Sequence, residues 1–376
     1  MVKGCSIEAG SKTMEGFVAE IDSEPIEKLR EAGAIILGKT VTTEYGYGQA
    51  LPVCKSPWDT SRYPGGSSVG SAVAVAVGSA TAALGTDAGG SIRSPAAWNG
   101  IVGLKPTYGI VPKRGVISLG PTVDHPGPLT KTVQDAETVL AVVAAPRFRA
   151  SIEGHCKDPD GGLDGKRLGI DRSFFYSDSA DPQVLRVVES ALGTLEGLGA
   201  TLVDVTIAEP EQVMAVVMVL LAVDVSFAHQ KWLREKRELY FPGTQLVLEL
   251  GELISAMDYL RAVQFRQDFK WRMKAVFEEH ALDGLVMSTS PMTAIPFEKL
   301  KVPLGKGSGA LADRIKHVAP FNLTGQPVVS VPCGLADDGM PVGLQFVGKP
   351  YRDGEALRMA AAFEAATTWH ELRPPI

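Results

Sequence analysis

The sequence predicts an α/β fold in which helices cover both faces of a mixed central β-sheet. Helical and extended patterns alternate along most of the chain, and such alternation favours helices packed on a sheet. Proline and glycine residues separate the patterned segments, as they do at turns. Apolar residues make up 45 % of the chain and charged residues 21 %, proportions typical of a globular protein with a buried core.

The first patterned segments predict a helix followed by a strand. Ser23 as N-cap and Pro25 as the first helical residue begin the helix, and Gly33 ends it. The segment AIILGK (34–39) then predicts a buried strand, because it is short, apolar and rich in β-branched residues.

The next segment, SAVAVAVGSATAALG (71–85), has a misleading period. Its alternation of Ala and Val is typical of a strand, but its length and its small side chains favour a tightly packed helix. We expect a helix in its first part and a strand at AALGTD (82–87). The following SIRSPA (91–96) predicts the start of another helix.

The carboxyl-terminal half continues the same alternation. Asp181 and Pro182 begin a helix that extends to Leu198. Strands are expected at GKRLGI, ATLVDVTI, GLVMSTSP, PVVSVPCG and PVGLQFVG, and a closing amphipathic helix at DGEALRMAAAFEAATTWH. The pattern of 210–280 is mainly helical. Residues 155–166 are polar and glycine-rich and predict a surface connection, so we expect 1–376 to fold as one domain.

Composition and charge exclude several classes of function. The formal net charge of −6 gives no basic surface for direct binding of nucleic acid. The four cysteines are far apart, so we expect neither a disulfide framework nor a thiolate metal site. We expect the protein to work in a reducing cytoplasm. No signal peptide is recognisable at the start. The longest apolar run, Val213 to Val223, is shorter than the ~20 residues of a membrane span. It predicts a buried helix, with an apolar surface near a substrate entrance as the alternative.

One local motif suggests a function that its residues do not support. GAIILGKT, Gly33 to Thr40, matches the phosphate-loop pattern G-x-x-x-x-G-K-[ST]. A phosphate loop needs a flexible backbone whose amides surround the phosphates, whereas Ala, Ile, Ile and Leu favour a strand here. The six histidines lie too far apart for a local metal-binding pattern. We therefore expect no nucleotide, no metal and no other cofactor.

The stretch LGTDAGGSIRSPA (84–96) surrounds Ser91 with residues that have almost no side chain. A nucleophilic hydroxyl needs a base, and it needs donors where negative charge develops on the attacked carbonyl oxygen. Glycine permits unusual backbone angles and the close approach of a substrate. The donors expected for this oxyanion hole are the backbone N–H groups of Ala88, Gly89, Gly90 and Ser91. A tight glycine turn that caps a helix through a serine is the alternative interpretation.

A second serine cluster, PGGSSVGS (64–71), lies upstream, and no histidine accompanies either cluster. A lysine kept neutral by burial is the remaining base for such serines. At these residues the sequence resembles the amidase signature enzymes. The resemblance rests on PGGSSVGSAVAVAVG, LGTDAGGSIRSPAAWNGIVGLKPTYGIVPKRGV and VDHPGPLTKTVQDAE, and it extends to AGAIILGKTVTTEYGYG and to the segment from APFNLTGQP onward. It covers nearly the whole chain.

The resemblance implies a Ser–cis-Ser–Lys triad in a single amidase-signature domain. The nucleophile of the family falls on Ser91 and its bridging serine on Ser67, with a cis peptide bond expected between Gly66 and Ser67. The lysine base falls on Lys3, in an amino-terminal part that is shortened relative to the family. Family members also brace the loops of the site with the residues that match Ser68, Asp87 and Arg93.

The implied activity is hydrolysis of a carboxylic amide C–N bond to an acid and ammonia or an amine, through a seryl acyl-enzyme. The expected substrate is a small molecule with a linear, non-peptide amide, with no membrane partner, and a homodimer is compatible with this activity. Two alternatives stay open. One is the glutaminase-type subunit of a glutamyl- or aspartyl-tRNA amidotransferase, whose partners would provide the tRNA contacts. The other is a shortened, inactive homologue that serves as a binding or scaffold protein.

Overall fold

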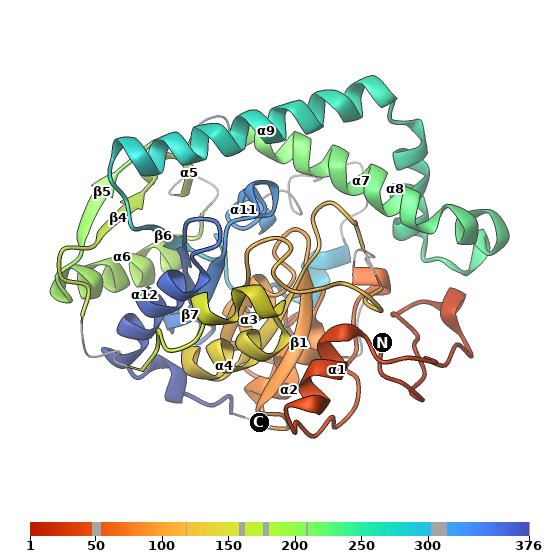
Figure 1. Cartoon of the computed structure of the whole chain (residues 1–376), viewed down its shortest axis with the longest axis horizontal. Helices are drawn as coiled ribbons and strands as arrows, with labels where there is room; N and C mark the ends of the chain where they lie inside the picture. The colour runs from red at the N-terminus through yellow and green to blue at the C-terminus, as the bar shows by residue number, and fades with distance from the viewer. Residues whose placement is uncertain are drawn as a thin grey trace.

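A computed structural model describes residues 1–46, 54–117, 119–157, 162–175, 180–207, 210–301 and 314–375. Within these residues, eight strands form one mixed sheet in the order β1-β3-β2-β7-β8-β6-β4-β5 (Figure 1). The strands are β1 (Ala82–Asp87), β2 (Val102–Lys105), β3 (His125–Thr130), β4 (Arg167–Ile170), β5 (Thr201–Asp204), β6 (Gly284–Ser288), β7 (Val328–Leu335) and β8 (Pro341–Val347). Strand β4 runs parallel to β5 and β6, and the other neighbouring pairs are antiparallel.

Helices cover both faces of this sheet, as the sequence predicts. The α-helices are α1 (Glu24–Glu31), α2 (Val69–Ala76), α3 (Arg93–Asn99), α4 (Val133–Val143), α5 (Arg172–Phe175), α6 (Pro182–Gly197), α7 (Pro210–Glu235), α8 (Pro242–Leu253), α9 (Ala256–Glu279), α11 (Pro320–Thr324) and α12 (Asp353–Ala365). Helices α4, α6 and α12 pack on one face, and α2 and α3 pack on the other. The two faces belong to different core clusters because side chains alternate along a strand. Val286 of β6 lies in a first core cluster, together with residues of α4, α6 and α12. Its neighbours Leu285 and Met287 lie in a second core cluster, together with residues of α7 and α9.

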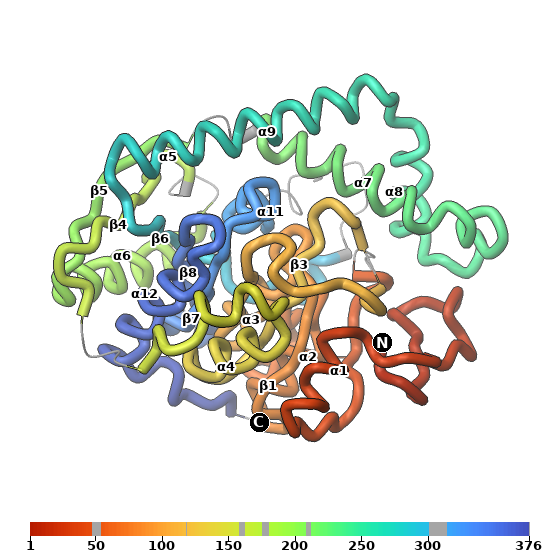
Figure 2. Tube along the Cα trace, in the orientation of Figure 1, coloured from red at the N-terminus to blue at the C-terminus, as the bar shows by residue number. Residues whose placement is uncertain are grey.

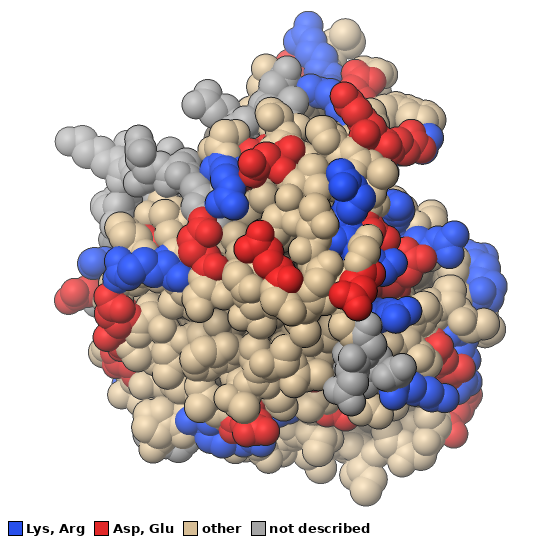
Figure 3. Space-filling view, turned by 90° about the vertical axis from the view of Figure 1, so that its left-hand side faces the viewer, with Lys and Arg blue, Asp and Glu red and all other residues tan. Residues whose placement is uncertain are grey.

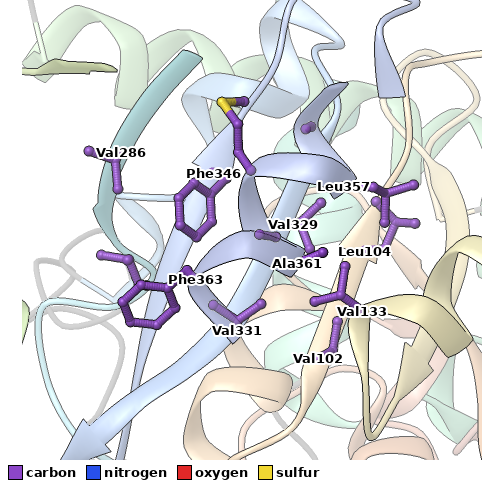
Figure 4. Close-up of a cluster of buried hydrophobic side chains, with 14 of the residues drawn as sticks. Val102, Leu104, Val133, Val286, Val329, Val331, Phe346, Leu357, Ala361 and Phe363 are labelled. Carbon is purple, nitrogen blue, oxygen red and sulfur yellow. The ribbon is translucent and has the colours of Figure 1, made fainter. Parts of the chain in front are cut away.

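The first core cluster fills the space between the central strands and α12. Figure 4 shows Val329, Val331 and Phe346 of β7 and β8 together with Leu357 and Phe363 of α12. These five side chains are buried. Because β7 and β8 lie in the middle of the sheet, this cluster holds together strands from the amino-terminal and the carboxyl-terminal halves of the chain.

Most elements form where local signals predict them. Ser23 is the N-cap of α1, and Gly33 follows its end with a φ of +86°. The segment 71–85 divides into the end of α2 and the start of β1, so its small side chains do form a helix followed by a strand. Of the surface connection expected at 155–166, residues 158–161 lie outside the described residues.

The prediction of a buried strand at 34–39 is wrong. The segment forms no strand, and the side chains of Ile35 and Leu37 are 86 % and 76 % exposed. An apolar segment becomes a buried strand only when a neighbouring strand and a covering layer are present. In the described part of the chain, no strand pairs with this segment.

Residues 210–279 form the long helices α7, α8 and α9, which lie together across the top of the molecule (Figures 1 and 2). By length and composition, Gln212–Glu235 of α7 is apolar enough to cross a membrane, but half of its most apolar window is buried inside the protein. Helix α7 packs against α8 and α9. Five residues of the run 213–223 are buried and the other six are half-buried or exposed, so the predicted burial holds for part of the helix surface. The five are Val213, Val217, Leu220, Leu221 and Ala222.

The charged side chains on the face drawn in Figure 3 are mixed in sign. Basic and acidic groups lie next to one another between areas of other residues. This mixture agrees with the small net charge of −6, and it is typical of a solvated protein surface.

Candidate active site

The loop that carries Ser91 connects the end of β1 to the start of α3. Ser91 is half-buried, and Gly90 before it has a φ of +110°. A Cβ atom on Gly90 would lie 2.3 Å from Cγ2 of Val318, so there is no space for any side chain. A glycine is therefore required here both for its backbone angle and for this close contact.

The Asp87 carboxylate fixes the shape of this loop. It accepts hydrogen bonds from the backbone amides of Gly90 (2.7 Å) and Ile92 (3.2 Å). It also accepts from Nε and Nη2 of Arg93, both at 3.0 Å, and both side chains are fully buried. Burial raises the pKa of Asp87, but the Arg93 guanidinium outweighs it and holds the pKa below its ordinary value. The structure thus brings Asp87 and Arg93 together beneath the predicted nucleophile.

The oxyanion hole needs one correction. The sequence predicts Gly90 as a donor, but its amide is already bonded to Asp87, which lies on the inner side of the loop. The amides of Ala88, Gly89 and Ser91 make no hydrogen bond to any other residue that the structure describes. Among the described residues, these three N–H groups therefore remain the candidate oxyanion donors.

The second serine cluster lies next to Ser91. The peptide bond between Gly66 and Ser67 is cis, as the resemblance implies. The Ser67 side chain is buried, and its carbonyl oxygen accepts from Thr42 Oγ1 at 3.0 Å. The backbone amide of Ser68 donates to the carbonyl oxygen of Ser91 at 3.2 Å. This bond joins the two serine segments, which are more than twenty positions apart in sequence.

The predicted contact between Lys3 and Ser67 is absent, which corrects the assignment of Lys3 as the base. The Lys3 side chain is exposed, and its backbone amide donates to Asp22 Oδ1 at 2.7 Å. Across the described ranges, no lysine or histidine side chain hydrogen-bonds to the hydroxyl of Ser67 or Ser91. Lys39 Nζ donates instead to the Ser6 carbonyl at 2.7 Å.

A family model described as Amidase matches residues 1–357. The chain belongs to the amidase family. It is 35 % identical over 409 aligned residues to a subunit of the glutamyl-tRNA(Gln) amidotransferase of Symbiobacterium thermophilum, and the alignment covers 99 % of the chain and 82 % of that protein. An amidase of Pseudomonas putida is 36 % identical over 367 residues, covering 95 % of the chain and 78 % of the relative.

A solved structure extends this similarity to three dimensions. A subunit of the glutamyl-tRNA(Gln) amidotransferase from Thermotoga maritima matches with a TM-score of 0.82 at 29 % identity, covering 97 % of the chain and 80 % of that protein. The α/β fold, with a mixed sheet covered by helices, is therefore that of the amidase family.

One residue that braces the site of this amidase-family chain is not predicted by the sequence. Asn322 of α11 donates to the Asp87 carbonyl at 2.8 Å and to Asp87 Oδ1 at 2.9 Å. Its own Oδ1 accepts from Arg93 Nη2 at 2.7 Å, and Arg93 Nη1 donates to the Val318 carbonyl at 2.9 Å. The segment APFNLTGQP contributes to the resemblance, but nothing in it indicates which distant residue Asn322 contacts.

Two other titratable groups lie buried beneath the loop. Lys105 donates from Nζ to the carbonyl oxygens of Gln326 and Pro106, and His125 Nδ1 lies 2.6 Å from the Val123 carbonyl. Burial lowers the pKa of both side chains. The positive charge of Arg93 lowers the pKa of Lys105 further, and the positive charge of Lys105 lowers that of His125 further. Both groups support the backbone rather than contact Ser91. In the part that the structure describes, no cluster of three or more His, Cys, Asp or Glu side chains could hold a metal ion.

Proposed function

We propose that this chain hydrolyses the C–N bond of linear, non-peptide carboxylic amides through a seryl acyl-enzyme. The observation that supports it most is the hydrogen bond between the Ser68 amide and the Ser91 carbonyl, which holds both serine segments together. This bond brings the residue next to Ser67 against Ser91, which supports a pairing of the two serine side chains in catalysis. A nucleophile next to a proton carrier and oxyanion donors is the minimum arrangement for acyl transfer.

In this mechanism Ser91 Oγ attacks the amide carbonyl carbon. Its proton passes to Ser67, whose own proton passes to a base. The amides of Ala88, Gly89 and Ser91 stabilise the oxyanion, and the loss of one such donor raises the barrier by about 2.7–4 kcal/mol. The C–N bond then breaks, and the leaving nitrogen takes a proton back through Ser67. Water attacks the acyl-enzyme ester, releases the acid and restores the Ser91 hydroxyl. We assign no base among the described side chains.

Labelling with a fluorophosphonate tests the proposal directly. The label reacts with activated serines, and peptide mapping of the modified protein identifies the residue. We expect the label on Ser91, no labelling of the Ser91→Ala protein and full labelling of Ser79→Ala, a control at an exposed serine. A label on another serine, or an unlabelled chain, would contradict the assignment.

A second candidate is the glutaminase-type subunit of a glutamyl- or aspartyl-tRNA amidotransferase. Its support is the 35 % identity to a relative that carries the name of such an enzyme. Glutamine hydrolysis only with partner subunits would favour it, whereas ammonia release from simple amides by the isolated chain would favour the amidase. A third candidate, an inactive binding or scaffold homologue, is supported by the exposed Lys3 and is favoured if no amide is turned over.

We also propose a reducing cytoplasm as the place of action and a homodimer as the assembly. All four cysteines carry free thiols, which supports the compartment. Light scattering on the purified chain measures the assembly, and a monomer mass at all concentrations would contradict the dimer.

A further inference from the structure

The apolar run 213–223 lies within α7, and three of its larger side chains form a stripe along the helix. Met214, Met218 and Leu221 follow one another at i, i+4 and i+7, so their side chains share one helical face. Leu221 is buried, whereas the two methionines are half-buried. The stripe therefore leads from the interior of the protein toward its surface.

The buried end of this stripe lies beside the loop of the nucleophile. Cδ1 of Leu221 is 3.7 Å from the position that a Cβ atom on Gly89 would occupy, and Cδ1 of Ile315 is 3.9 Å from the same position. Ala88 belongs to the same apolar cluster as Leu221. Two apolar side chains from distant parts of the chain thus flank the candidate oxyanion donors next to Ser91.

A buried carboxylate holds α7 in this place. Asp224 Oδ2 accepts from the backbone amide of Thr122 at 3.1 Å and from the Thr122 hydroxyl. Thr122 lies in the loop before β3, and His125 at the start of β3 pairs with Asp87 at the end of β1. Leu221, one helical turn before Asp224, is therefore fixed relative to the loop that follows Asp87.

We propose that Met214, Met218, Leu221 and Ile315 form an acyl-binding surface for an unbranched aliphatic acyl group. This inference rests on the proposed function, because it places the acyl chain relative to Ser91. When the substrate oxygen faces the candidate oxyanion donors of the loop, its α-carbon lies near Gly89. The chain then passes Leu221 and continues along the two methionines, whose flexible side chains adapt to chains of different length.

The same surface disfavours a charged acyl group. Burying an ammonium or carboxylate against apolar side chains without a partner is costly. The α-ammonium and α-carboxylate of glutamine would lie in this direction if glutamine bound with its side-chain amide at Ser91. The acyl-binding surface therefore favours simple aliphatic amides as the substrate class.

Chain-length dependence of hydrolysis tests the inference. Burying one methylene group completely strengthens binding by about fourfold. Four partly buried methylene groups should therefore strengthen binding by at least about tenfold. We expect kcat/KM for the 4-nitroanilide of hexanoic acid to exceed that of acetic acid by this factor. Leu221→Asp should abolish the preference, and Phe227→Ala, an exposed position on the same helix, should keep it. Equal kcat/KM for both anilides would overturn the inference and leave the proposed function standing.

A binding measurement separates the two proposals. Calorimetric titration of the Ser91→Ala protein compares hexanamide with acetamide and needs no turnover. We expect hexanamide to bind at least about tenfold more tightly, and Leu221→Asp in the same background to remove the difference. Tighter hexanamide binding without hydrolysis of any anilide by the unmodified chain would contradict the proposed function alone. Equal binding of both amides would overturn the acyl-binding surface.

Discussion

The backbone amide of Ser68 donates a hydrogen bond to the carbonyl oxygen of Ser91 at 3.2 Å. Ser68 follows the cis pair Gly66–Ser67, and Ser91 lies in the loop between β1 and α3, so the bond joins these two segments. On the other side of the same loop, the Asp87 carboxylate binds the Gly90 amide at 2.7 Å. The position of Ser91 is thus determined from two sides, and substitutions on either side should move it.

Gly90→Ala should destabilise the protein, because its Cβ would overlap Val318 and because a φ of +110° is unfavourable for alanine. We expect the free energy of unfolding in urea to fall by about 2 kcal/mol or more, together with loss of labelling at Ser91. Gly89→Ala is the matched control, since its nearest contact would be an ordinary 3.7 Å. Partial recovery in the double variant Gly90→Ala, Val318→Ala would identify the overlap as the cause, and equal stability of both single variants would contradict it.

Asp87→Asn should leave the Arg93 guanidinium buried without its counter-charge. Breaking a buried ion pair at one partner costs about 3–5 kcal/mol, so urea unfolding should show a loss of that size. The control is Asp337→Asn, which breaks the exposed pair with Arg186 and should change stability by about 1 kcal/mol or less. A similar small loss in both variants would mean that Asn322 alone is sufficient to hold the loop.

Lys3→Met should leave labelling of Ser91 by the fluorophosphonate unchanged. The reason is geometric, because the exposed Lys3 side chain makes no contact with Ser67. Rates of labelling for the variant and the unmodified chain are compared under the same conditions. A strong decrease for Lys3→Met, with no decrease for Lys12→Met at another exposed lysine, would restore Lys3 as the base.

Local signals are sufficient to predict much of this fold and part of the site. The Ser23 cap of α1 and the division of 71–85 into helix and strand each depend on residues close in sequence. The roles of Asp87 and Arg93 beside Ser91 follow from the family resemblance and not from local signals. The cis bond at Ser67 follows from the family resemblance and not from the local residues.

The predictions that fail require knowledge of distant partners. Apolar composition predicts a strand at 34–39, but burial depends on a neighbouring strand that the composition does not specify. The role of Asn322 depends on Asp87, which lies 235 positions away. The availability of the Gly90 amide and the position of Lys3 likewise depend on tertiary contacts that one sequence does not contain.

Glu364 gives the protein a pH-dependent stability. Burial raises its pKa to about 7, although both carboxylate oxygens accept from the Val133 amide, at 3.0 and 3.1 Å. An unfolded glutamate has a pKa near 4.5. Between these values the folded state keeps a proton that the unfolded state has released. The free energy of unfolding therefore falls as pH rises through this window, by up to about 3 kcal/mol.

Glu364→Gln should remove this dependence, because glutamine keeps an acceptor for the Val133 amide and carries no charge at any pH. Urea unfolding at about pH 5 and about pH 7.5 measures the slope. The unmodified chain should be less stable at the higher pH, and the variant should lose most of that difference. Glu355→Gln, at an exposed position of the same helix, should retain it. An unchanged slope in Glu364→Gln would assign the pH dependence to another buried group.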